Sequence, residues 1–85
     1  MQEEARRKVL SKIAPSYPEI ARRMQITGTV RLQVEIQPNG LVGHSKVLGG
    51  HPMLAQAALD AIQKWKWAPA AETTTETVEV NFNPQ

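Results

Sequence analysis

The feature that most constrains the fold is a strict alternation of apolar and polar residues near the middle of the chain. The apolar positions of this run are Val30, Leu32, Val34 and Ile36. A period of two predicts a strand with one buried face and one hydrated face. The tripeptide Pro38-Asn39-Gly40 follows, and Asn-Gly favours a hairpin turn that needs a positive φ. We therefore expect an antiparallel hairpin here.

Two further strands are predicted from weaker alternation. In the run from Leu41 to Leu48, the alternating residues share one face of a strand only if one extra residue is accommodated. This predicts a β-bulge at Gly43. Near the C-terminus, Val78, Val80 and Phe82 alternate with polar residues. This segment is the expected last strand.

Prolines introduce two predicted helices. Pro18 suits the first position of a short helix, whose expected apolar face is Ile20, Ala21 and Met24 and whose expected stop is Gly28. Pro52 opens a second helix, which Pro69 should end. The apolar stripe expected on this helix is Leu54, Ala57, Ala58, Ala61, Ile62 and Trp65.

These elements predict an α+β fold with a three-stranded antiparallel sheet and two helices packed on one of its faces. The second helix returns the chain along the sheet, so the spatial strand order should be second, first, third (2-1-3), with the last strand at an edge. We assign residues 15–85 to this domain. Residues 1–14 form an N-terminal extension, where the spacing of Val9 and Ile13 fits either a helix or a strand.

Composition limits the classes of protein. A chain of 85 residues with 41% hydrophobic residues suits one small domain. It has no cysteine for a disulfide or a thiolate metal site. Its net charge of +2 gives no strong field for nucleic acid. The basic runs at Arg6 to Lys8 and at Arg22-Arg23 are read as solvated helix faces, with a small polyanion-binding site as the alternative.

The sequence contains few residues whose spacing suits catalysis or metal binding. His44 and His51 have no acidic residue or cysteine at ligand spacing, so we expect no metal site, no cofactor and no enzyme activity. Both histidines are interpreted as structural: His44 as a solvated strand residue and His51 as the residue before a helix. Trp65 and Phe82 fall on buried faces, so a base-stacking platform for nucleic acid is not expected.

The remaining hypothesis is a binding module that uses its edge strand. An extended peptide can add to such an edge through main-chain hydrogen bonds, and a second copy of the chain could pair there to form a homodimer. Alternatively, Thr73 to Thr77 and Glu79 keep an unused edge soluble. The pattern alone leaves these readings open.

Taken together, the residues resemble the C-terminal domain of the TonB family of energy transducers. The resemblance lies in "PSYPEIARRMQITGTVRLQVEIQPNGLV", in "VLGGHPMLAQAALDAIQKWKWAP" and in the terminal alternating strand. Its most specific parts are Tyr17-Pro18 ahead of Gly28, the Pro38-Asn39-Gly40 turn, and Trp65, Trp67 and Pro69 at the end of an alanine-rich helix.

The resemblance implies a periplasmic domain that grips the TonB box, a short N-terminal peptide of a TonB-dependent outer-membrane transporter, by β-strand addition. It also implies a parent protein that is anchored in the inner membrane and driven by an ExbB/ExbD-type motor. Some family members attach this domain to sensors or other envelope proteins, which is the alternative function.

Carried over by residue, the resemblance implies that partner contacts involve Pro15, Tyr17, Pro18, Val78, Glu79, Val80, Asn81 and Phe82. Ala14 departs from the pattern, because some members carry a glutamine just before the proline of a "QPxYP" stretch. Tyr17 could instead staple the short helix to the sheet. Trp67 could either cap the core or stay partly exposed.

Overall fold

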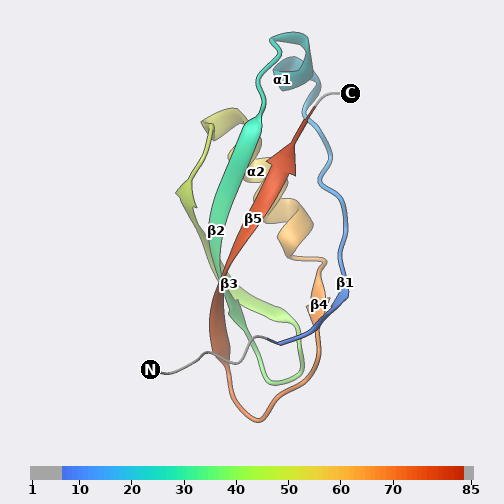
Figure 1. The fold of residues 1–85 in the computed structure, drawn as a ribbon, viewed down its shortest axis with the longest axis vertical. Helices are drawn as coiled ribbons and strands as arrows, with labels where there is room; N and C mark the ends of the chain where they lie inside the picture. Colours follow the sequence, from blue (N-terminus) through green and yellow to red (C-terminus); the bar gives the residue numbers. More distant parts are fainter. Residues whose placement is uncertain (1–6, 84–85) are drawn as a thin grey trace.

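The computed structural model describes residues 7–83 and confirms the predicted sheet. The three strands β2 (Gly28–Ile36), β3 (Val42–Gly49) and β5 (Thr74–Phe82) lie in the order β3-β2-β5, and both pairings are antiparallel (Figure 1). This is the predicted order 2-1-3, with the last strand at an edge.

The core lies on one face of this sheet. The alternating residues Val30, Leu32, Val34 and Ile36 are all fully buried there. Helix α2 (Pro52–Ile62) packs against β2 and β3 on this face. Its buried residues are Leu54, Ala58, Ala61 and Ile62. Within residues 7–83, neither helix has the length and apolar character needed to cross a membrane.

Helix α1 (Glu19–Arg23) differs from its prediction at both ends. Pro18 is its extended N-cap rather than its first helical residue. The helix ends at Arg23 with Met24 as its C-cap, and the residue with positive φ that terminates it is Gln25 (φ 58°) and not Gly28. The Ile26 N–H donates to the Ala21 carbonyl at 2.9 Å and the Gln25 N–H to that of Arg22 at 3.1 Å. These bonds form a Schellman motif, which satisfies carbonyls that the helix end would otherwise leave free.

Only one residue of the predicted α1 face enters the core. Ala21 is fully buried, whereas Ile20 and Met24 are 55% and 59% exposed. A helix of five residues makes little more than one turn. Because so short a helix can direct only one position inward, the expected three-residue apolar face was wrong.

The hairpin and its bulge follow the prediction. Pro38 to Gly40 form a three-residue loop, closed by hydrogen bonds between Gln37 and both Gly40 and Leu41. Gly40 alone carries the positive φ, 89°. Between Val34 and Ile36, β3 holds one residue more than β2, so the bulge lies at Gly43 and His44.

The chain after α2 turns earlier than predicted. The helix ends at Ile62 instead of running toward Pro69, and Trp65 lies in the turn that follows. Strand β4 (Lys66–Trp67) then pairs with β1 (Val9–Ser11). This pairing assigns the ambiguous N-terminal segment to a strand over these residues; positions 1–6 lie outside the described residues. Trp67 is 1% exposed and completes the core.

Candidate functional site

The free edge of β5 is the most regular open surface of the sheet. All nine residues of β5 pair with β2 without a register shift. Within residues 7–83, no other strand pairs with β5, and no backbone hydrogen bond joins it to another segment. Every second N–H and C=O group of β5 therefore points away from β2 without a backbone partner.

The opposite edge of the sheet is less suited to pairing. Strand β3 has two register irregularities against β2, one opposite Arg31 and Leu32 and the other opposite Val34 to Ile36. Bulges of this kind interrupt the row of backbone groups and protect an edge from added strands. Of the two edges, β5 is the better acceptor.

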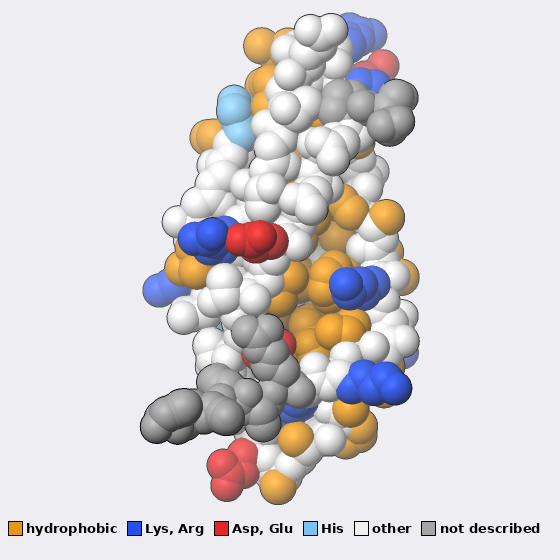
Figure 2. Space-filling view, in the orientation of Figure 1, with side chains coloured by type: hydrophobic (Ala, Val, Ile, Leu, Met, Phe, Trp, Pro, Cys, Tyr) orange, Lys and Arg blue, Asp and Glu red, His pale blue; other side chains and the backbone are white. Residues whose placement is uncertain are grey.

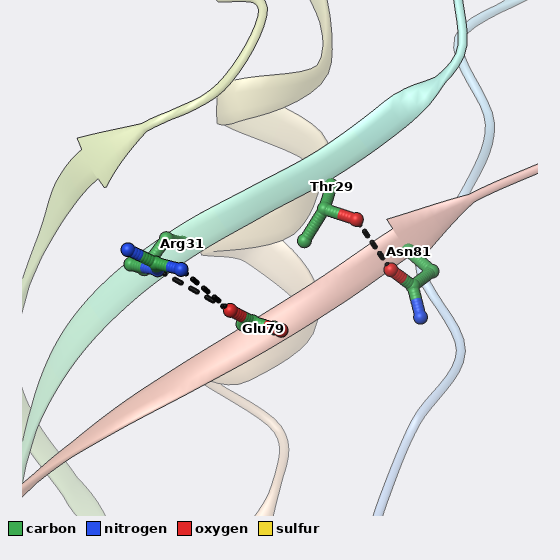
Figure 3. Close-up of polar contacts among 4 residues, drawn as sticks. All are labelled: Thr29, Arg31, Glu79 and Asn81. Carbon is green, nitrogen blue, oxygen red and sulfur yellow. Dashed lines mark hydrogen bonds and ion pairs between the residues drawn. The ribbon is translucent and has the colours of Figure 1, made fainter.

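Cross-strand pairs hold β5 onto β2 on the hydrated face (Figure 3). Arg31 and Glu79 are register partners, and their side chains form an ion pair at 2.9 Å. Thr29 and Asn81 are also partners, and the Thr29 hydroxyl donates to Asn81 Oδ1 at 2.6 Å. The side chains of Glu79 and Asn81 are thus engaged with side chains of β2.

The other predicted site residues of β5 face the core. Val80 and Phe82 are 4% and 2% exposed, so their side chains are not available to a partner. Val78 is half-buried against the core cluster. Any contact that β5 makes at its free edge therefore depends mainly on its main chain.

Residues 7–17 form a segment that we call the N-terminal strap, which runs beside β5 beyond its free edge (Figure 1). The strap includes Pro15 and Tyr17, both half-buried. The Tyr17 ring packs edge-on against Phe82, with centroids 5.6 Å apart and planes at 87°. Its hydroxyl donates to the Ile26 carbonyl. Tyr17 therefore does staple the α1–β2 connection to β5.

Apolar side chains gather at the surface between β5 and the strap (Figure 2). These two elements contribute Val9, Tyr17 and Val78 as partly buried apolar residues that pack against the core, and Leu10 and Ile13 of the strap are exposed. A strand added to β5 would lie over this region, so its inward side chains would meet an apolar surface.

Arg7 is the residue that the sequence analysis missed. Arg7 does not lie on the expected solvated helix face: it is half-buried outside any helix, and its guanidinium donates to four backbone carbonyls. No spacing in the sequence signals this role, because the acceptors are main-chain groups contributed by two distant segments.

The structure assigns the histidines to local roles. His51 is the N-cap of α2, and its Nδ1 accepts from the Met53 N–H at 3.0 Å. His44 is exposed in the bulge of β3. The part of the chain that the structure describes holds no group of three or more potential metal-ligating side chains.

Residues 7–83 thus form a small α+β domain whose edge strand β5 is regular and, among these residues, has no strand paired to its outer side. Its fold is similar to the "Solution NMR structure of Pseudomonas aeruginosa TonB CTD", with a TM-score of 0.73, 25% identity, and coverage of 89% of this chain and 84% of that one. The sequence profile described as Gram-negative bacterial TonB protein C-terminal matches residues 13–84. The chain belongs to this TonB C-terminal family.

Full-length relatives are similar over most of this chain. It is 27% identical to Protein TonB of Klebsiella pneumoniae over 77 residues, which cover 88% of this chain and 32% of that protein. It is 37% identical to Protein tonB2 of Pseudomonas aeruginosa over 76 residues, which cover 81% of this chain and 28% of that protein. The chain thus spans about a third or less of the length of these relatives.

Proposed function

We propose that this domain is the periplasmic, receptor-binding end of an energy transducer, and that it binds the TonB box of an outer-membrane transporter by β-strand addition. Membership of the TonB C-terminal family supports the transducer role. The observation that carries the binding mode is the uninterrupted register of β5 against β2, together with an outer edge of β5 to which none of the described strands is paired.

Strand addition suits a domain whose task is to hold a peptide under tension. Main-chain hydrogen bonds give affinity with little demand on side chains, and here the β5 side chains are engaged with β2 or with the core. In this proposal the parent protein is anchored in the inner membrane and driven by an ExbB/ExbD-type motor. The domain itself is non-catalytic and transmits the pull to the bound transporter.

A titration with a synthetic TonB-box peptide tests this proposal. Backbone amide signals of β5 should shift on addition of the peptide, and those of β3 should not. The same peptide with a central proline is the matched control, because it cannot complete the ladder. Shifts confined to basic residues such as Arg22 and Arg23, with binding lost in salt, would instead support the polyanion alternative.

A further inference from the structure

Two contacts join the N-terminal strap to β5, one near each end of that strand. At one end, the Arg7 N–H donates to Glu76 Oε2 at 3.1 Å. At the other, the Tyr17 ring packs on Phe82. Between these contacts, no backbone hydrogen bond links the strap to β5 within residues 7–83. The open part of the β5 edge therefore extends from Thr77 to Asn81.

Arg7 fixes the strap at the Glu76 end. Its Nη1 donates to the Gln37 carbonyl at 2.7 Å and to that of Ala68 at 3.4 Å. Its Nη2 donates to the carbonyls of Ile36, at 3.3 Å, and Glu72. These acceptors lie at the end of β2 and in the β4–β5 connection. Hydrogen bonds from a charged donor are stronger than neutral ones, so one side chain ties the strap to both segments beside the start of β5.

The middle of the strap is held away from the β5 edge by other partners. Strand β1 pairs with β4, and the Ala68 N–H donates to the Lys8 carbonyl at 2.8 Å. Further along, the Trp65 indole N–H donates to the Ile13 carbonyl at 3.0 Å. These bonds occupy strap carbonyls on the side of β4 and Trp65, which leaves the edge between Thr77 and Asn81 accessible.

We propose that Arg7 is a positioning residue that sets the length and the register of the peptide accepted by β5. This inference rests on the proposed function. The edge from Thr77 to Asn81 accommodates about five extended residues, or ~17 Å of strand. We expect a longer peptide to gain nothing at the Glu76 end, because the strap, joined to the Glu76 carboxylate by the Arg7 N–H, would lie in the path of a peptide that pairs with Thr74 to Glu76.

The test compares peptides of two lengths on the wild type, on Arg7→Gln and on Lys8→Gln. The short peptide is a five-residue TonB-box segment, and the long ones extend it by three residues at either end. Lys8→Gln removes the same charge from the adjacent residue, which is exposed. Dissociation constants and backbone amide shifts are measured for each pair, and thermal unfolding is recorded for each variant.

On the wild type and on Lys8→Gln, the long and short peptides should bind within about twofold of each other, with shifts confined to residues 77 to 82. On Arg7→Gln, one of the long peptides should bind about fivefold tighter than the short one, the gain expected from about one added hydrogen bond. Its shifts should extend to Thr74, Thr75 and Glu76. If Arg7→Gln does not fold, Arg7→Lys replaces it, because lysine keeps the charge but lacks the planar guanidinium that reaches all four carbonyls.

Two results would overturn the role of Arg7 while leaving strand addition intact. One is a wild-type domain that already prefers a long peptide and shows shifts at Thr74 to Glu76. The other is a folded Arg7→Gln or Arg7→Lys variant with an unchanged preference for length. If no peptide shifts a β5 amide in any protein, the proposed function itself fails.

Discussion

Tyr17 and Phe82 meet edge to face, with ring centroids 5.6 Å apart, and this contact joins the N-terminal strap to the last residue of β5. The Tyr17 hydroxyl adds a hydrogen bond to the Ile26 carbonyl. Tyr17→Phe should cost about 1 kcal/mol of unfolding free energy, because it removes that bond and keeps the ring. Tyr17→Ala should cost about 2 to 4 kcal/mol, because the half-buried ring is lost as well. Urea denaturation measures both, and equal losses would show that the ring contact contributes nothing.

Trp65 is predicted to be the most sensitive aromatic position next to the strap. Its side chain is 8% exposed, its ring lies 5.8 Å from that of Trp67, and its indole N–H donates to Ile13. Trp65→Ala should cost about 3 to 5 kcal/mol, enough to unfold a domain of this size. Lys66→Ala, at the exposed neighbouring residue, is the control and should unfold as the wild type does. Unaltered thermal unfolding of Trp65→Ala would refute its place in the core.

Gly40 is predicted to tolerate no side chain. Its φ is 89°, and a Cβ there would lie 2.1 Å from the Trp67 carbonyl oxygen. Backbone strain alone costs about 1 to 3 kcal/mol, and the contact with main chain adds to it, so Gly40→Ala should lose at least about 2 kcal/mol of stability. Gly49→Ala is the matched control, because a Cβ at Gly49 meets nothing within 4 Å. Similar unfolding midpoints for the two variants would contradict the turn geometry.

The alternation of β2 was predictable because a nine-residue strand with one buried face leaves each side chain only two environments. The edge position of β5 followed from the direction in which α2 returns the chain. The exposure of Ile20 and Met24 was not predictable. In so short a helix, packing and not sequence period decides which residue faces the core. The β1–β4 pair and the Arg7 contacts were also missed, since three-residue pairing and main-chain acceptors leave no repeat in the sequence.

A pair of proline variants on β5 separates folding from peptide capture. Successive N–H groups of a strand point to opposite edges, so one of Glu79 and Val80 donates toward β2 and the other toward the free edge. Proline at the residue whose N–H donates toward β2 should cost about 3 kcal/mol or more of stability. Proline at the residue whose N–H faces the free edge should cost less stability than proline at its neighbour, and should weaken peptide binding by the folded variant about tenfold. Unfolding curves and a peptide titration of both variants distinguish the two effects, and undiminished binding in the well-folded variant would argue against edge pairing.

Hydrogen exchange of the β5 amides, with and without saturating TonB-box peptide, tests the central claim most directly. Strand addition predicts that bound peptide slows exchange at alternate amides between Thr77 and Asn81, while the amides of β3 exchange at their original rates. Unchanged exchange along β5 despite bound peptide, or new protection along β3, would contradict the account.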